Sequence, residues 1–162
     1  MKNLSSFYQF IVEEVQSYKF ELISDNSMLF KYSFEDAVGN NYLVEFKNVP
    51  IAKKGILSNT YELVYFVKQD DYYSVSKIVN VNPYRVFETI LGDIFKDFIE
   101  RCSWVKTIFF VGLSKDKERD YISSRTKAYK RYLDMNPPKG FSVTQTGNSI
   151  QLRKSAFIYF VL

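Results

Sequence analysis

Apolar residues recur in adjacent pairs at every fourth position between residues 83 and 102. The pairs are Val86–Phe87, Ile90–Leu91, Ile94–Phe95 and Phe98–Ile99. Such pairs draw a broad apolar stripe along one side of a helix, while charged residues occupy the other positions. Asn82 is suited to cap the first turn, and Pro83 is suited to the first helical position, where its missing N–H is not needed. The pattern predicts an amphipathic helix that lies on a sheet.

A second pattern, the alternation of apolar and polar residues, predicts strands on both sides of this helix. Before the helix, two strands joined by a turn at Gly39-Asn40 form a hairpin, and two more strands follow. After the helix, residues 105–111 carry apolar side chains on both faces, which favours a strand inside the sheet. A turn at Gly147-Asn148 predicts a final hairpin. The other predicted strands span residues 28–34, 42–47, 61–68, 72–79, 141–145 and 150–153.

Two shorter segments also have helical periodicity. Residues 4–17 place apolar side chains at spacings of three and four, and residues 119–134 do so again before Asn136-Pro137-Pro138 ends the helix. The order of elements predicts an α+β fold, with a mainly antiparallel sheet and about three helices packed on it. A length of 162 residues fits one domain, so we assign residues 1–162 to a single domain.

Composition limits the chemistry that this fold can carry. The chain has no histidine and one cysteine, but 13 tyrosines and 15 phenylalanines. Metal sites of His and Cys and catalytic Ser-His-Asp or Cys-His arrangements are therefore excluded, and no Walker-type or Gly-x-Gly-x-x-Gly loop occurs. We interpret most rings as core, the alternative being an adhesive surface. Cys102 continues the apolar pattern of its helix, so we interpret it as a buried, inert thiol.

Positive charge is concentrated in the second half of the chain. Residues 1–80 have eight lysines, ten acidic residues and a net charge of −2, whereas residues 81–162 hold every arginine and a net charge of +6. Within the predicted 119–134 helix, basic residues lie beside tyrosines, a combination that suits phosphate contacts and base stacking. The candidate binding face comprises Arg125, Lys127, Tyr129, Lys130 and Arg131. Alternatively, the tyrosines form the buried stripe of the helix and the basic residues are only its solvated face.

Carboxylate chemistry remains open as a third alternative. The adjacent acidic pairs are Asp70-Asp71 and Glu35-Asp36, and both lie where turns are predicted. Aspartate favours turns because its side chain bonds to nearby main-chain groups. A metal-dependent nuclease would need several acidic residues to converge from different elements, which a linear sequence does not reveal.

Three stretches of the chain carry a resemblance to a known family. They are Asn82-Pro83-Tyr84-Arg85-Val86-Phe87-Glu88-Thr89-Ile90, Ile108-Phe109-Phe110-Val111-Gly112 and Ser124-Arg125-Thr126-Lys127-Ala128-Tyr129. Over roughly residues 61–153 the chain resembles a group of small uncharacterised proteins common in tailed-phage genomes and related to a bacterial domain of unknown function. It departs from that group at Ala128, where leucine is usual, and in lacking the usual Gly-Asp before the first helix. The resemblance implies a phage-like origin and a scaffold around Arg125 and Tyr129, but no activity.

These observations lead to a ranked set of expectations about function. The first is a non-enzymatic phage-type accessory or virion-associated protein that binds another protein or a second copy of itself. The alternative is a nucleic-acid-binding protein that uses the 119–134 helix, and the third is the carboxylate nuclease. We expect no cofactor, no membrane association and a location in the virion or the host cytoplasm, since the sequence contains no long apolar run.

Overall fold

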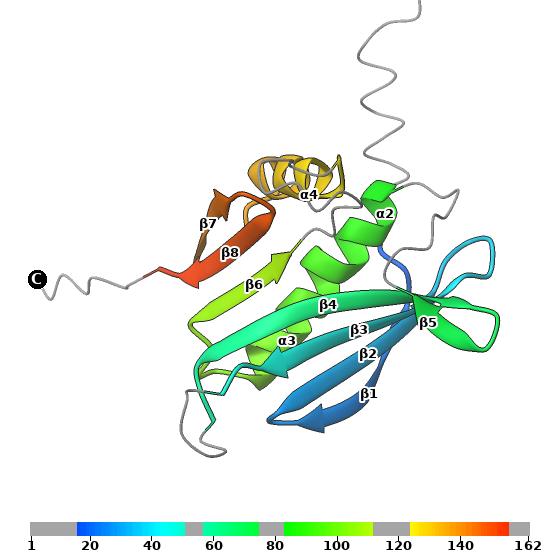
Figure 1. Ribbon diagram of the computed structural model, residues 1–162, viewed down its shortest axis with the longest axis horizontal. Helices are drawn as coiled ribbons and strands as arrows, with labels where there is room; N and C mark the ends of the chain where they lie inside the picture. Colours follow the sequence, from blue (N-terminus) through cyan, green and yellow to red (C-terminus); the bar gives the residue numbers. More distant parts are fainter. Residues whose placement is uncertain (1–15, 51–56, 75–82, 112–123, 156–162) are drawn as a thin grey trace, which may run out of the picture.

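The computed structural model of the protein describes residues 16–50, 57–74, 83–111 and 124–155. In that part of the chain an eight-stranded sheet has the strand order β1-β2-β3-β4-β6-β8-β7, with β5 paired to β4 beside this path (Figure 1). Of the strand pairs described, only β4–β6 is parallel, so the sheet is mainly antiparallel, as predicted. The strands are β1 (Phe20–Asn26), β2 (Leu29–Glu35), β3 (Asn41–Asn48), β4 (Thr60–Gln69), β5 (Tyr72–Ser74), β6 (Thr107–Val111), β7 (Phe141–Thr146) and β8 (Ser149–Lys154).

The described residues contain two helices rather than about three. The first is continuous and consists of α2 (Pro83–Phe87), η1 (Glu88–Ile94) and α3 (Phe95–Arg101), and the second is α4 (Ser124–Met135). The helix predicted over residues 4–17 lies outside the described residues except at its last two positions. Residues 75–79 of the predicted fourth strand and residues 119–123 of the predicted last helix also lie outside them. The coarse prediction of an α+β fold with helices on a sheet is confirmed.

One strand was not predicted. Strand β1 lies at the edge of the sheet and pairs antiparallel with β2, and its register shifts between Leu22 and Ser24. This irregularity leaves Ile23 56% exposed and interrupts the alternation that identifies a strand. A polar end, Ser24-Asp25-Asn26, weakens the signal further. The predicted hairpins β2–β3 and β7–β8 are confirmed, and so is the interior position of β6 between β4 and β8.

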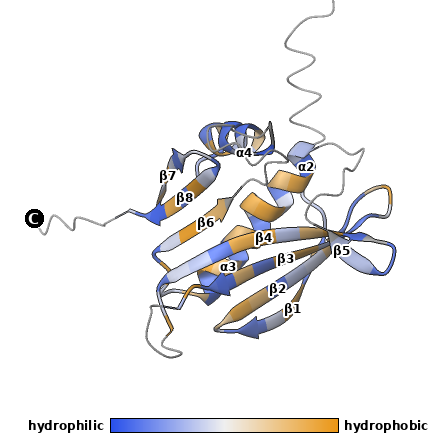
Figure 2. Cartoon of the chain, viewed as in Figure 1, coloured by the Kyte–Doolittle hydropathy of each residue, from blue (hydrophilic) through white to orange (hydrophobic). Residues whose placement is uncertain are grey.

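The middle of the first helix, η1, is a π-helix, in which each N–H bonds to the carbonyl five residues earlier. Its apolar pairs recur every four residues, which exceeds the 3.6 residues of an α-helical turn, so in a regular α-helix the pairs would drift by about 40° at each repeat. The wider π turn offsets this drift. Consequently Val86, Ile90, Ile94 and Phe98 are all buried against the sheet. The apolar bands of this helix and the largely hydrophilic surface of α4 are visible in Figure 2.

Aromatic rings form the centre of the core, between the sheet and the first helix. Phe98 is fully buried, and its ring stacks on Phe46 from β3 with the two centroids 4.0 Å apart. The rings of Phe30 and Tyr61 meet Phe98 edge-on at 5.2 and 5.1 Å. These arrangements are the ones that aromatic rings prefer when packed. The interpretation of most rings as core is confirmed for the described residues, in which Tyr72, Tyr73 and Trp104 are the exposed rings.

Candidate functional site

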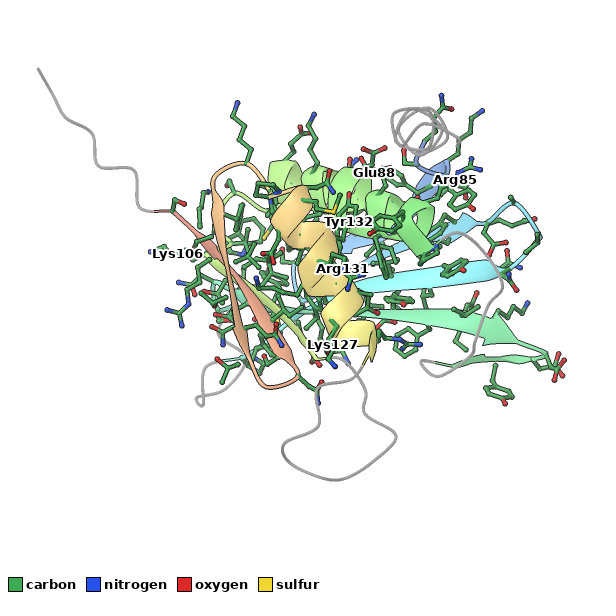
Figure 3. The ribbon with its side chains drawn as sticks, turned by 90° about the horizontal axis from the view of Figure 1, so that it is seen from above. Arg85, Glu88, Lys106, Lys127, Arg131 and Tyr132 are labelled. Atoms are coloured by element: carbon green, nitrogen blue, oxygen red, sulfur yellow. The ribbon has the colours of Figure 1, made fainter. Side chains whose placement is uncertain are left out.

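The residues of the candidate binding face point in different directions from α4. Tyr129 is 5% exposed and its hydroxyl donates to the hydroxyl of Tyr65 on β4 at 2.8 Å. Its ring is covered by Phe87 and Phe110, so it presents no surface on which a base could stack. Tyr132 is also buried, and its hydroxyl bonds to the carboxylate of Glu88 on η1 (Figure 3). The tyrosines of α4 therefore attach the helix to the core.

The basic residues of α4 divide into three groups. Lys127 and Arg131 are exposed and lie one helical turn apart on the outer side of α4 (Figure 3). Lys130 pairs with Asp134 at 2.6 Å along the same helix. Arg125 is half-buried, with its guanidinium carbon 5.7 Å from the centre of the Tyr65 ring. Only Lys127 and Arg131 thus form an outward-facing basic pair.

Arg125 and Tyr129 do meet, at a cavity beneath α4. Strand β4 pairs with β6 only at Thr60–Glu62, and beyond this point the two strands diverge while α4 covers the opening. The resulting space has a volume of about 180 Å³. We call it the α4 cavity, and it is lined by Glu62, Leu63, Val64, Tyr65, Phe87, Ile90, Leu91, Phe110, Arg125 and Tyr129.

The α4 cavity is partly open to solvent, and its exposed lining is mainly apolar. A concave, mainly apolar pocket with a few convergent polar groups is the usual form of a small-molecule site. The α4 cavity is therefore a candidate site.

The predicted acidic pairs do not converge. Asp70 and Asp71 are exposed in the β4–β5 turn, where Asp70 has a left-handed φ of 53°. Asp36 is buried and accepts hydrogen bonds from the main-chain N–H groups of Val38 and Asn40 at 3.0 and 2.9 Å. Across the described ranges, no three His, Cys, Asp or Glu side chains lie close enough together to hold a metal ion.

A third feature is a group of exposed apolar side chains at one end of the sheet. Met28, Leu57 and Trp104 are 38%, 38% and 37% exposed, and Trp104 is the only tryptophan of the chain. They come from three connections that are distant in sequence: β1–β2, β3–β4 and α3–β6. We call these three residues the Trp104 patch. Exposed apolar side chains on neighbouring connections are typical of interaction surfaces.

Hydrogen bonds hold the three connections of the Trp104 patch together. Asn48 is buried; its main-chain N–H donates to Met28 at 2.9 Å and its side-chain amide donates to the carbonyl of Ser58 at 2.8 Å. Tyr61 donates to the carbonyl of Ser27 at 2.7 Å and accepts from the indole of Trp104 at 3.1 Å. Burial raises the pKa of Tyr61 to about 12, so its hydroxyl stays protonated and available as a donor at neutral pH. The apolar side chains thus project from a fixed framework.

Lysines lie beside the Trp104 patch. Lys106, two residues after Trp104, donates from its main chain to Asn59 at 2.8 Å and is exposed. Exposed Lys154 on β8 places its ammonium 3.4 Å from the carbonyl of Ser103. Figure 3 shows Lys106 at the end of the molecule opposite Arg85. The patch therefore combines an apolar centre with a positively charged border.

Cys102, beside this framework, is fully buried, as predicted. Burial raises the pKa of its thiol, which keeps the sulfur protonated near neutral pH. The thiol is therefore in its unreactive form, and it adds no nucleophile to the patch.

Neither the α4 cavity nor the Trp104 patch follows from the sequence alone. The cavity depends on where β4 and β6 diverge, and no local pattern records that point. For the patch, the one available signal is the lone Trp104 in a connection, since Met28 falls in the strand predicted over residues 28–34. The contacts that bring them together depend on Asn48 and Tyr61, which look like ordinary strand residues.

No protein-family model matches the chain, and no curated protein matches it. The resemblance to small tailed-phage proteins therefore stays a prediction. Neither helix in the described part of the chain is long and apolar enough to cross a membrane.

Proposed function

We propose that this protein is a non-enzymatic accessory protein of phage type, virion-associated or located in the host cytoplasm, that binds another protein through the Trp104 patch. The observation that carries the proposal is the indole of Trp104, 37% exposed with its N–H already bonded to Tyr61. An indole held in this way offers apolar area with little loss of conformational freedom on binding. Tryptophan is also among the residues that dominate binding energy at protein interfaces.

The lysines at the border of the patch favour an acidic partner. Lys106 and Lys154 are both exposed beside Trp104, and charge complementarity at the border of an interface steers association and selects the partner. A symmetric contact between two copies would place the same patch on both sides. Both copies would then carry these lysines at the contact, which adds like charge on both sides and disfavours association. The partner we propose is therefore a different protein, one that presents an apolar side chain flanked by Asp or Glu.

Selection from a random peptide library tests this proposal without a known partner. The immobilised protein should enrich peptides with an aromatic or branched aliphatic residue flanked by acidic residues. These peptides should fail to bind the double variant Met28→Ser, Leu57→Ser, whose melting temperature is measured in parallel. Val38→Ser, which alters a side chain 67% exposed in the β2–β3 turn at the opposite end of the sheet, is the matched control and should bind normally. Peptides that bind the double variant and the wild type equally would refute the proposal.

A second candidate function, polyanion binding, is supported by Lys127 and Arg131, which are both exposed on the outer side of α4. Affinity for single-stranded DNA that falls steeply with salt would be its signature, because binding releases counterions. The double variant Lys127→Ala, Arg131→Ala should lose this affinity without a lower melting temperature. Lys130→Ala, which alters the lysine paired with Asp134, should lose less of the affinity for DNA. Unchanged DNA binding in the double variant would exclude this function for α4.

A further inference from the structure

We infer that the α4 cavity is a binding site for a small apolar carboxylate, with its carboxylate held by Arg125 and the hydroxyl of Tyr65. This site is separate from the Trp104 patch and from the protein-binding function proposed above. No residue of the patch lines the cavity, whose walls come from β4, β6, the first helix and α4.

The size of the cavity limits the ligand. Its volume is about 180 Å³, slightly more than an engineered apolar cavity of about 150 Å³ that stays dry and binds benzene. A single aromatic ring or a short branched chain fits such a space. Phe87, Ile90 and Phe110 contribute apolar surface on different sides, so the buried part of the ligand must itself be apolar.

Two polar groups favour a carboxylate at the mouth. The guanidinium of Arg125 lies over the ring of Tyr65, with the guanidinium carbon 5.7 Å from the ring centre. Guanidinium groups recognise carboxylates through paired, charge-assisted hydrogen bonds. The hydroxyl of Tyr65 accepts a hydrogen bond from Tyr129 at 2.8 Å, which leaves its own O–H to donate to a ligand. Arg125 and Tyr65 thus provide donors at the same cavity.

Glu62 lines the same cavity and would favour a cation instead. It supplies one acceptor group, whereas Arg125 and Tyr65 supply donors from two different elements. Burial also raises the pKa of Tyr129 well above its ordinary value, so its hydroxyl remains neutral and adds no negative charge to repel a carboxylate. The balance of groups therefore favours an anionic ligand, and the experiment below includes the cationic alternative.

The test uses three probes that share a benzyl group and differ in charge: phenylacetate, uncharged ethylbenzene and cationic phenethylamine. Methyl NMR on the full chain follows Leu63, Ile90 and Leu91, whose methyl groups line the cavity. Phenylacetate should shift these signals saturably. The affinity obtained from the titration should be higher for phenylacetate than for either of the other probes. The emission of Trp104, which does not line the cavity, should not change. Absence of saturable shifts with phenylacetate, or tighter binding of phenethylamine, would overturn the inference.

Variants separate recognition of the carboxylate from simple filling of the cavity. Arg125→Gln should lower the affinity for phenylacetate by about tenfold or more, as expected for lost charge-assisted hydrogen bonds. It should leave the affinity for ethylbenzene unchanged. Tyr65→Phe should lower the affinity for phenylacetate by a smaller factor, again with the affinity for ethylbenzene unchanged. Arg131→Gln removes an exposed guanidinium from the same helix and is the matched control. Equal losses in Arg125→Gln and Arg131→Gln would show that only general charge attraction acts, which would contradict a built site.

Discussion

The indole N–H of Trp104 donates to the hydroxyl of Tyr61 at 3.1 Å, across 43 positions of the sequence. Tyr61 is fully buried on β4 and in turn donates to the carbonyl of Ser27. One core tyrosine therefore fixes the position of the exposed tryptophan and of the β1–β2 turn. The framework of the sheet and the proposed binding surface are joined at this hydroxyl.

The variant Tyr61→Phe tests this connection. It removes only the hydroxyl, so the ring can keep its contact with Phe98 while Trp104 and the carbonyl of Ser27 lose their partner. The free energy of unfolding should fall by about 1–3 kcal/mol, because two hydrogen bonds are lost and each contributes about 1 kcal/mol net. The anisotropy of Trp104 emission should also fall, because the indole becomes freer to move. Tyr72→Phe, at a side chain 57% exposed, is the control and should change neither quantity. Unaltered anisotropy in Tyr61→Phe would show that the hydroxyl does not hold the indole.

Phe98→Ala tests the aromatic centre of the core. Phe98 is fully buried and its ring contacts three other rings, so truncation should lower the free energy of unfolding by about 3–5 kcal/mol. Urea denaturation measures the change. Ile23→Ala, at a side chain 56% exposed on β1, should stay within about 0.5 kcal/mol of wild type. A loss below about 1 kcal/mol in Phe98→Ala would mean that the helix does not pack on the sheet through this face.

Asp36 should make stability depend on pH in the acid range. Burial raises the pKa of this carboxyl, but hydrogen bonds from Asn40, Val38 and Tyr42 outweigh burial and hold the pKa below its ordinary value of 3.8. Because the pKa is lower in the folded state, the contribution of Asp36 to stability is present above pH 3.8 and is lost as the pH falls through the folded value.

The variant Asp36→Asn provides the measurement. At neutral pH it should be less stable than wild type by about 1–3 kcal/mol, the range for hydrogen bonds to a charged group or for a buried group that loses its partners. Denaturation curves recorded at decreasing pH should show this difference shrinking below pH 3.8. A difference that is independent of pH would mean that the ionised carboxylate contributes nothing to the β2–β3 turn.

Periodicity predicted the elements that have one buried and one solvated face. The first helix, both hairpins and the interior strand β6 lie where the patterns placed them, because burial on one face imposes a period that the sequence must follow. Strand β1 was not predicted, because its register shift and its polar end interrupt that period. The π-helical segment is a borderline case, since the four-residue recurrence of Val86, Ile90, Ile94 and Phe98 indicates a helix wider than α, although we predicted an ordinary one.

The candidate sites were harder to predict because they depend on distant contacts. The sequence shows which residues of α4 are basic, but it could not show that Tyr129 faces the core while Lys127 faces solvent. In a helix whose tyrosines and bases alternate, burial is decided by the partner surface, here Tyr65, Phe87 and Phe110. The Trp104 patch likewise exists only because Asn48 and Tyr61 join three separate connections.

The emission of Trp104 provides the most direct test of the central claim, since it is the only tryptophan in the chain and lies in the proposed interface. Titration with an acidic peptide obtained by the selection above should shift this emission to shorter wavelength, saturably, as the exposed part of the indole becomes covered. The affinity should decrease with added salt, because the border lysines are exposed and screened. The double variant Lys106→Glu, Lys154→Glu should bind the peptide with a still lower affinity. A peptide that binds by calorimetry but leaves the emission of Trp104 unchanged would contradict the proposal that this patch is the binding surface.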